Sequence, residues 1–228
     1  MEEKDISTRL LEAVEKTAAR MGLNVEDCKA NMLLAYVEEL TRWNKAYNLV
    51  GRKLGAQGIV DLCVDAITPL CFKELIAPQK EVVDIGSGAG MPGIPLYILA
   101  GPFPLTLVES QRKKITFLQH VRRKLGLEGI RIYPGRAETM CREEDHLNAY
   151  ETAFARAVAD PPRILKLASP ILCDGGRLVI FVGEKDAEGL RRSSTLLEAR
   201  GFKLQTTRST KRFTSRDNHL ALLIKMAK

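Results

Sequence analysis

Apolar side chains recur every three or four residues through the first 75 positions of the chain, which is the spacing of one face of an α-helix. This pattern predicts a helix over Asp5–Met21 and a second helix that begins after a capping residue, Asn24. The apolar stripe that predicts the buried face of the second helix consists of Cys28, Met32, Tyr36, Leu40, Trp43 and Tyr47. A third helix is expected over residues 56–72, so we expect residues 1–75 to form a helical cap.

From residue 81 onward, short apolar runs alternate with helical patterns, as in the βαβ units that build a parallel sheet. The expected strands are Glu81–Ile85, Leu105–Glu109, Ile130–Tyr133, Thr152–Val158, Arg177–Val182, Phe202–Arg208 and His219–Met226. The expected helices are Pro92–Leu99, Arg112–Leu125, Pro162–Leu172 and Lys185–Ala199, with a short turn near residues 137–142.

No helical pattern separates the last two strands, which predicts that they form an antiparallel hairpin. An alternating α/β chain that ends in this way is typical of class I S-adenosylmethionine-dependent methyltransferases more than of NAD domains. We therefore expect residues 76–228 to form a methyltransferase domain with a Rossmann-like, mostly parallel, seven-stranded sheet.

The composition, with 45% hydrophobic and 28% charged residues, is that of a globular chain. No apolar run approaches the roughly 18 to 20 residues that span a bilayer, so no membrane segment is expected. The acidic start, Met1–Asp5, lacks the basic and apolar regions of a signal peptide. These features predict a cytoplasmic protein.

The positive charge is concentrated in the C-terminal two thirds of the chain. Residues 1–75 hold 10 of the 35 Lys and Arg and 12 of the 28 Asp and Glu, a net charge of −2, which leaves 25 and 16, a net charge of +9, for the rest. A basic domain favours a polyanionic partner because each neutralised phosphate releases counterions. The alternative explanation of this net positive charge is that the Lys and Arg side chains are solvated on the exposed faces of helices.

The five cysteines are odd in number and no two of them form a Cys-x-x-Cys pair, which is typical of reduced thiols in the core. The three histidines, His120, His146 and His219, are isolated from one another and from the thiols. A zinc site needs clustered ligands, so no metal is expected.

The strongest local motif runs from a strand through a glycine turn into a helix: Val82-Val83-Asp84-Ile85-Gly86-Ser87-Gly88-Ala89-Gly90-Met91-Pro92-Gly93. Glycines allow a tight turn and a close approach of backbone to ligand, and free N–H groups at the helix start face the ligand. We therefore expect Gly86, Gly88 and Gly90 to bind a cofactor.

Two cofactor classes fit this turn, because Gly88-x-Gly90-x-x-Gly93 also has the dinucleotide spacing. Asp84 favours S-adenosylmethionine, since a carboxylate two residues before the first glycine suits the cationic amino group of the methionine moiety. Pro92 and Pro95 remove N–H donors that a pyrophosphate would need.

Two further acidic residues follow strands of the predicted sheet. Glu109 ends the second strand, where its carboxylate can accept hydrogen bonds from both ribose hydroxyls. Glu138, in Gly135-Arg136-Ala137-Glu138 after the third strand, is expected near the adenine together with the backbone N–H of Ala137. Taken alone, the Gly135–Glu138 segment is also consistent with Glu138 as a solvated acidic residue on the surface.

Three blocks of sequence together resemble the RsmG (GidB) family, bacterial methyltransferases of small-subunit (16S) ribosomal RNA that modify N7 of a guanine. The blocks are Trp43-Asn44-Lys45-Ala46-Tyr47-Asn48-Leu49, the glycine motif continued to Pro95, and Phe154-Ala155-Arg156-Ala157-Val158. The resemblance implies that S-adenosylmethionine contacts Gly86, Met91, Ala137, Glu138 and Arg156. It also implies that the partner is small-subunit ribosomal RNA or its ribonucleoprotein particle.

The chain departs from the family pattern at positions that bear on RNA contacts. The family often has an Arg-His pair where this chain has Asp61-Leu62, although Asp65 is kept. A family Lys-Gly appears as Val182-Gly183, and an arginine before the final strand appears as Asn218.

Guanine N7 carries a lone pair and no proton, so methyl transfer to it needs alignment and no general base. We therefore predict no catalytic acid or base. Arg156 has two interpretations: it contacts cofactor or an RNA phosphate, or it is the buried partner of a carboxylate such as Glu138.

Two alternative functions remain open. The first is methylation of an exocyclic amine, because methyltransferases that act on such amines carry an Asp-Pro-Pro-aromatic tetrad after the fourth strand. In this chain Asp160-Pro161-Pro162 is followed by Arg163 in place of the aromatic residue. A Pro-Pro pair is also a common start of a helix. The second alternative is a ribosome-binding protein without activity.

The segment Arg208–Arg216 between the last two strands carries cations around one aromatic ring. Lys211, Arg212 and Arg216 are expected to bind RNA phosphates while Phe213 stacks on an unpaired base. The alternative is a solvated turn whose Phe213 folds back onto the sheet. If the final strand runs antiparallel to a neighbour that enters at the amino edge of the sheet, the loop is expected near that edge.

Overall fold

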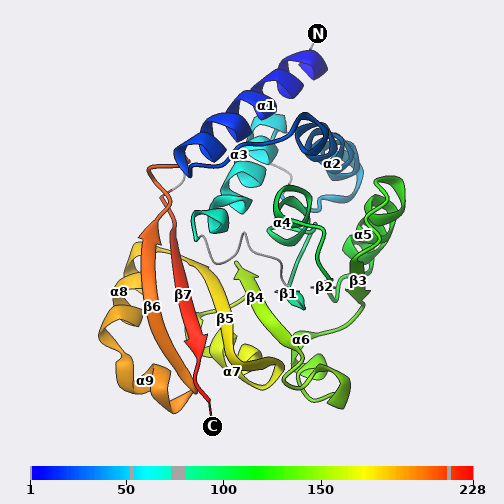
Figure 1. The fold of residues 1–228 in the computed structure, drawn as a ribbon. Helices are drawn as coiled ribbons and strands as arrows, with labels where there is room; N and C mark the ends of the chain where they lie inside the picture. The colour runs from blue at the N-terminus through cyan, green and yellow to red at the C-terminus, as the bar shows by residue number, and fades with distance from the viewer. Residues whose placement is uncertain (1, 52–53, 73–80, 215–216, 228) are drawn as a thin grey trace.

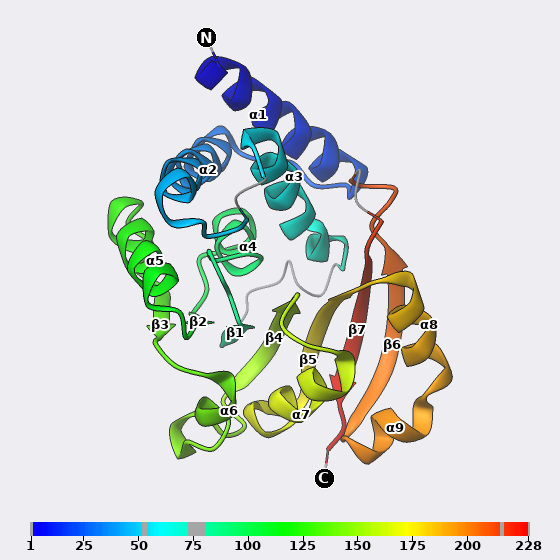
Figure 2. The same cartoon turned by 180° about the vertical axis from the view of Figure 1, so that it is seen from behind.

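Helices cover both faces of a single seven-stranded sheet in the computed structural model (Figures 1 and 2). The structure describes residues 2–51, 54–72, 81–214 and 217–227. The predicted boundary between a helical region and a methyltransferase domain, at residues 75 and 76, lies outside the described residues. Within the described ranges no helix has the length and apolar character needed to cross a membrane.

The sheet has the strand order β3-β2-β1-β4-β5-β7-β6. Its strands are β1 (Val82–Ile85), β2 (Leu105–Val108), β3 (Ile130–Tyr133), β4 (Tyr150–Arg156), β5 (Leu172–Val182), β6 (Phe202–Ser209) and β7 (His219–Lys225). Neighbouring strands from β3 to β5 are parallel, whereas β7 runs antiparallel to both β5 and β6. The predicted seven strands and the terminal hairpin are confirmed.

The chain order of the strands reverses at β1, which has β2 on one side and β4 on the other. In open α/β sheets, ligands bind outside the carboxyl ends of the strands at such a reversal. The fold therefore places the glycine turn, which follows β1, at the edge where a ligand site is expected.

Each face of the sheet has its own hydrophobic core because successive strand residues point to opposite faces. Val82 belongs to one core cluster and Val83 to the other. The first cluster includes side chains of α1 (Glu2–Arg20), α2 (Asp27–Tyr47), α3 (Ala56–Ala66), α4 (Gly93–Ala100) and α5 (Arg112–Lys124). The second includes side chains of α6 (Ala137–Met140), α7 (Pro161–Ile171), α8 (Glu184–Arg192) and α9 (Ser194–Ala199).

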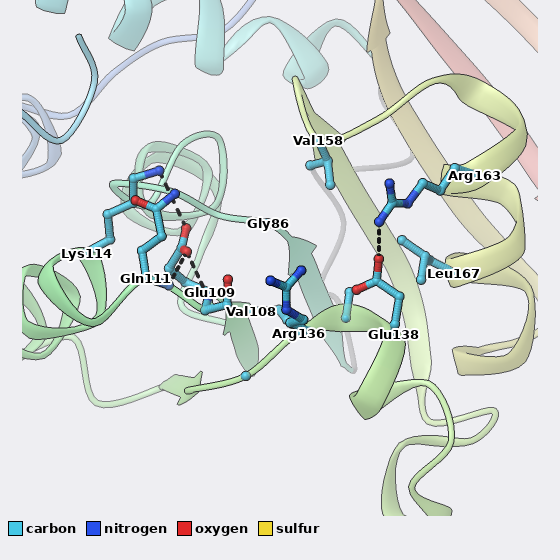
Figure 3. Close-up of a pocket in the computed structure, with 13 residues that line it drawn as sticks. Gly86, Val108, Glu109, Gln111, Lys114, Arg136, Glu138, Val158, Arg163 and Leu167 are labelled. Atoms are coloured by element: carbon cyan, nitrogen blue, oxygen red, sulfur yellow. Dashed lines mark hydrogen bonds and ion pairs between the residues drawn. The ribbon is translucent and has the colours of Figure 1, made fainter.

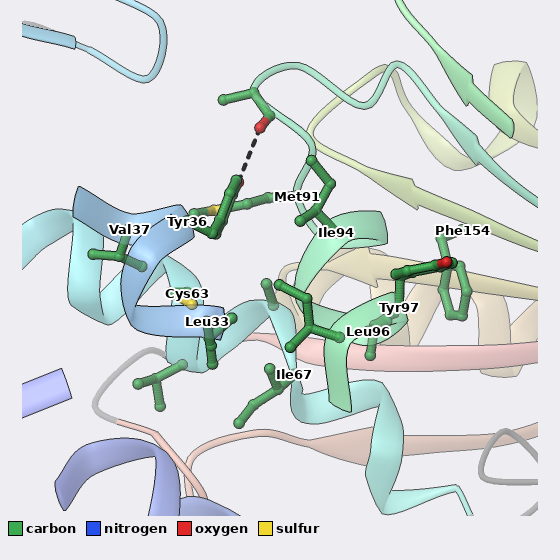
Figure 4. Close-up of a cluster of buried hydrophobic side chains, with 14 of the residues drawn as sticks. Leu33, Tyr36, Val37, Cys63, Ile67, Met91, Ile94, Leu96, Tyr97 and Phe154 are labelled. Carbon is green, nitrogen blue, oxygen red and sulfur yellow. Dashed lines mark hydrogen bonds between the residues drawn. The ribbon is translucent and has the colours of Figure 1, made fainter. Parts of the chain in front are cut away.

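The N-terminal helices pack directly on the α/β part of the molecule. In Figure 4, Leu33 and Tyr36 of α2 and Cys63 of α3 face Ile94 and Leu96 of α4. These side chains are all buried and belong to one continuous cluster. The helical cap therefore completes the core on this face of the sheet.

The buried face of α2 differs from the predicted stripe. Tyr36 and Leu40 are fully buried, as expected, but Cys28 and Met32 are exposed and Tyr47 is 52% exposed. The residues buried on this helix are Ala30, Leu33, Tyr36, Val37, Glu39, Leu40 and Asn44. The stripe was wrong at its ends because apolar residues occur on two faces of α2, and their spacing alone does not tell which face packs against the neighbouring helices.

The bounds of several predicted elements differ from those of the structure, most of them by one to three residues at an end, and three elements differ in other ways. The helix expected over residues 56–72 ends at Ala66 and is followed by a 3-10 helix, η1 (Thr68–Cys71), which accommodates Pro69 near its start. The helix expected over Lys185–Ala199 is divided at Ser193, whose φ and ψ of −113° and 46° are not helical. Strand β5 begins at Leu172 and so includes residues expected in the preceding loop.

Candidate active site

The glycine turn connects the end of β1 to α4 and is held in place by side chains on either side of it. The backbone N–H of Gly93 donates to Oδ2 of Asp84 at 2.8 Å. The hydroxyl of Tyr36 on α2 donates to the carbonyl oxygen of Ala89 at 2.9 Å (Figure 4). The helical cap therefore contributes directly to the shape of the turn.

Glycine is required at this turn by backbone conformation. Gly86, Gly88 and Gly90 have φ values of 68°, 60° and 96°, a region that other L-residues rarely adopt. A Cβ on Gly86 would lie 2.7 Å from a methyl carbon of Val158, whereas a Cβ on Gly88 would meet open space. The turn therefore presents bare backbone, as a bound ligand requires.

Asp84 is fully buried beneath the turn. Burial is the main cause that raises the pKa of its carboxyl to about 7, against the hydrogen bond from Gly93 and the positive charge of Arg156, which lower it. Its Oδ1 has no hydrogen-bond partner among the described residues. An orphaned carboxylate oxygen at this point fits the predicted cationic amino group of S-adenosylmethionine.

A pocket of about 270 Å³ opens at the carboxyl edge of the sheet (Figure 3). Its lining residues are Gly86, Val108, Glu109, Ser110, Gln111, Lys114, Gly135, Arg136, Ala137, Glu138, Val158, Arg163 and Leu167. The pocket thus brings together four residues expected at a cofactor site, Gly86, Glu109, Ala137 and Glu138. Asp84, Gly88, Gly90, Met91 and Arg156 are not among the lining residues, and the Met91 side chain packs in the core (Figure 4).

Glu109 lies on one wall of the pocket, directly after β2. Its Oε1 accepts hydrogen bonds from the backbone N–H groups of Ser110 and Gln111 at 2.8 and 2.7 Å. Its Oε2 is 3.9 Å from the ammonium of Lys114. One carboxylate oxygen is thus fixed by backbone, which orients the other as an acceptor for a ligand hydroxyl.

Glu138 lies on the opposite wall and forms an ion pair with Arg163 of α7 (Figure 3). The hydrogen bond from Arg163 is the main cause that lowers the pKa of Glu138. The apolar side chains of Val108, Val158 and Leu167 also line the pocket. Two oriented carboxylates beside apolar surface suit a ligand that carries both a ribose and a planar base.

The segment Asp160-Pro161-Pro162 forms the start of α7. The side chain of Asp160 accepts a hydrogen bond from the backbone N–H of Arg163 at 3.2 Å, and Pro161 is the first helical residue. The Arg163 side chain, at the position of the aromatic ring in amine methyltransferases, pairs with Glu138. The helix-start interpretation accounts for the whole segment.

Arg156 is the buried partner of a carboxylate, but the carboxylate is Asp65 and not Glu138. Its Nη2 is 2.8 Å from Oδ2 of Asp65, and its Nη1 donates to the carbonyl oxygen of Leu62. Asn218, which stands where the family has an arginine, donates its amide to both oxygens of Asp65 at 3.2 and 3.1 Å. Glu138, which the sequence offered as an example of such a carboxylate, pairs with Arg163 instead.

The loop between β6 and β7 lies at the carboxyl edge of β5, so the predicted position at the amino edge is wrong. His219, at the start of β7, pairs with Val182 at the end of β5. Since β7 is antiparallel to β5 and to β6, β6 ends at the same edge as the parallel strands. The loop therefore shares this edge with the glycine turn.

The aromatic ring of this loop is not presented to solvent. Phe213 is 3% exposed, and its carbonyl oxygen accepts a hydrogen bond from Thr17 of α1 at 3.1 Å. This agrees with the alternative in which the ring folds back. Lys211 pairs with Asp217 at 3.7 Å, and Arg212 lies over the Phe213 ring. The role of Lys211 and Arg212 in RNA binding stays a prediction, and Arg216 lies outside the described residues.

Several pocket residues were not expected from the sequence. Gln111 caps the start of α5 and Lys114 belongs to its first turn, and their place in the sequence shortly after Glu109 was the only signal available for them. Val158 reaches the pocket from a turn in which Ala157 has a φ of 52°, unusual for a residue other than glycine. In the described part of the chain, no three His, Cys, Asp or Glu side chains form a group suited to a metal ion.

Solved structures of methyltransferase-type proteins share this architecture. Aeropyrum pernix fibrillarin with bound S-adenosyl-L-methionine aligns with a TM-score of 0.53 and 18% identity over 65% of this chain and 67% of that one. M. jannaschii TYW2 in complex with AdoMet aligns with a TM-score of 0.51 and 19% identity over 67% and 72%. These similarities identify the class I methyltransferase fold.

Sequence comparison identifies the family. The ribosomal RNA small subunit methyltransferase G of Alkaliphilus metalliredigens is 31% identical over 81% of this chain and 77% of its own length. The protein of the same name from Carboxydothermus hydrogenoformans is 32% identical over 86% and 83%. The model of the GidB family, rRNA small subunit methyltransferase G, matches residues 29–220. With the glycine turn, the pocket and the sheet order in agreement, the chain belongs to the GidB family of small-subunit ribosomal RNA methyltransferases.

Proposed function

We propose that this chain transfers a methyl group from S-adenosylmethionine to N7 of a guanine in small-subunit (16S) ribosomal RNA. The observation that carries the proposal is the pocket at the carboxyl edge, with Gly86, Glu109 and Glu138 on its walls. Membership of the family supports the RNA substrate, and the sequence resemblance implies the N7 position.

The residues of the pocket fit the cofactor. Glu109, fixed by two backbone N–H groups, would accept hydrogen bonds from the ribose hydroxyls, and Glu138 would hold the adenine from the opposite wall. Asp84 lies buried beneath the glycine turn and does not line the pocket, and its orphaned Oδ1 would attract the methionine amino group from there. When bound, the cofactor supplies a methyl group on a positively charged sulfur.

The nucleophile needs little chemical help from the protein. Guanine N7 has an available lone pair, so the chain has to orient the base and exclude water, and no proton must be removed. The cations around the pocket, Lys114, Arg136 and Arg163, would favour an approaching phosphate backbone. Methylation of an exocyclic amine is less well supported, because Asp160 caps α7 and an arginine follows the prolines.

The test is methylation of small-subunit ribosomal RNA from a strain that lacks this activity, with labelled cofactor and digestion to nucleosides. We expect the label in 7-methylguanosine. Label in an N-methylated adenine or guanine amine would support the amine alternative, and no transfer to naked RNA or to assembled small subunits would contradict the proposal.

Glu109→Ala provides the matched test of the pocket. We expect the KM for S-adenosylmethionine to rise about 10- to 100-fold, because hydrogen bonds to a charged acceptor contribute roughly 1.5 to 3 kcal/mol. Glu198→Ala, which removes an exposed acid from α9, should leave the KM unchanged. An unchanged KM for Glu109→Ala would place the cofactor elsewhere.

A further inference from the structure

Helix α5 presents an unusually cationic surface beside the pocket. Six of its 13 residues are Lys or Arg and none is acidic. Its buried face is formed by Phe117, Leu118 and Val121. The cations therefore have to lie on the sides of the helix that face away from the core.

One stripe of α5 points directly away from that buried face. Arg112, Thr116, Gln119 and Arg123 are separated by four, three and four residues, which aligns them along the helix. All four side chains are exposed. At a rise of 1.5 Å per residue the two arginines are roughly 16 Å apart along the axis, so the stripe can follow a strand of nucleic acid over several nucleotides.

The C-terminal end of α2 adds an aromatic ring to this surface. The ammonium of Lys113 donates to the carbonyl oxygens of Tyr47 and Asn48 at 3.0 and 3.4 Å, which joins α2 to the start of α5. Tyr47 is 52% exposed, and Trp43 supports its ring with a centroid distance of 5.3 Å. The two helices lie side by side in both views of the fold (Figures 1 and 2).

Charge on this surface is not balanced locally. Within the described residues, no carboxylate forms an ion pair with Arg112, Lys113 or Arg123. Glu39 lies between α2 and α5 and pairs with Arg42, Lys124 and His120. One carboxylate cannot neutralise the positive charge of all three partners. The excess positive charge favours a polyanion.

The surface is continuous with the candidate active site. Lys114, which lines the pocket, belongs to the same helical turn as Arg112 and Lys113. Gln111, which also lines the pocket, is the capping residue directly before that turn. An RNA strand bound along α5 would therefore have nucleotides at the mouth of the pocket.

We propose that the α2–α5 face, defined by Tyr47, Arg112, Lys113 and Arg123, is a docking surface for the RNA substrate. Its cations bind phosphates, and the ring of Tyr47 stacks on an unpaired base, because an exposed aromatic ring among cations is the arrangement that binds single-stranded nucleic acid. This proposal rests on the proposed function and gives it a second contact region, apart from the loop between β6 and β7.

The first test measures binding of a small-subunit ribosomal RNA transcript as a function of salt. Arg112→Ala with Arg123→Ala should weaken binding and reduce the slope of log K against log salt by about 1.4, or roughly 0.7 for each lost contact with single-stranded RNA. Arg192→Ala with Arg200→Ala, on the side of α8 and α9, removes the same charge and should leave the slope unchanged.

The second test concerns the aromatic ring. Tyr47→Ala should weaken RNA binding roughly tenfold, whereas Tyr47→Phe should keep it, because stacking needs the ring and not the hydroxyl. Affinity for S-adenosylmethionine, measured by calorimetry, should be the same in all these variants.

The outcomes separate the two proposals. If the parent methylates RNA but the Arg112 and Arg123 double variant keeps the parent slope, the docking surface is wrong and the function stands. The surface is also wrong if Lys211→Ala with Arg212→Ala lowers the slope instead. If the parent binds RNA through this face but transfers no methyl group to RNA or to assembled subunits, the proposed function fails and the surface stands.

Discussion

Arg156 connects three parts of the chain that are far apart in sequence. It lies at the end of β4, pairs with Asp65 of α3, and its guanidinium lies 5.3 Å from the centroid of the Phe181 ring on β5. Asp65 is fully buried and also accepts from Asn218. At the scale of a single residue, the position that the family resemblance assigns to the cofactor thus has a structural partner in this chain.

Arg156→Ala should lower the free energy of unfolding by about 3 to 5 kcal/mol, because it leaves the Asp65 carboxylate buried without its cation. Urea denaturation would measure this, and Asp65→Asn in the same chain should recover part of the loss. A variant that unfolds like the parent but no longer binds S-adenosylmethionine would show that the cofactor contact dominates.

Glu39 is a buried carboxylate in the contact between α2 and α5, where it pairs with His120 and Lys124. Burial raises the pKa of Glu39, but hydrogen bonds from Lys124, His120 and Arg42 outweigh it and lower the pKa to about 2. A carboxyl whose pKa is lowered in the folded state stabilises the protein above its ordinary value of 4.5, and this stability is lost as the pH falls toward about 2.

Glu39→Gln should therefore lower the free energy of unfolding at pH 7 by about 1 to 2 kcal/mol, a range that allows for solvent screening of the exposed partners. It should also flatten the decrease in stability between pH 4.5 and 2. Thermal unfolding across that range is the measurement, with the exposed Glu128→Gln as control. An unchanged acid profile would mean that the three cations do not stabilise the carboxylate.

The helical cap and the α/β part of the molecule share one core. Tyr36 and Cys63 pack with Ile94 and Leu96, and the Tyr36 hydroxyl also holds the glycine turn. The division of the chain at residues 75 and 76 remains a prediction. The shared core predicts how a fragment that begins at residue 76 would unfold.

A fragment of residues 76–228 should lack a cooperative thermal unfolding transition, because removal of the cap exposes the apolar side chains that face it. Circular dichroism during heating would measure this, with the full chain as reference. A fragment that unfolds cooperatively would show instead that the α/β part is an independent domain.

Patterns among neighbouring residues in the sequence predict much of this fold. The seven strands, the hairpin and the turn from Asp84 to Gly93 follow from apolar periodicity and from the backbone freedom of glycine, which are properties of neighbouring residues. The same local signals placed Glu109 and Glu138 after strands, and both line the pocket. This prediction was possible because residues at the carboxyl ends of parallel strands lie at the same edge of the sheet, independently of how the helices pack.

The partners of the buried charges and the exposed faces of the helices follow from the packing of distant segments. Asp65 instead of Glu138 meets Arg156, Phe213 turns inward against α1, and the loop between β6 and β7 lies at the carboxyl edge. Tyr47, expected in the core, is exposed beside the cations of α5. Each of these depends on which distant elements pack together and in which direction they run, and the spacing of residues within one segment carries no information on that.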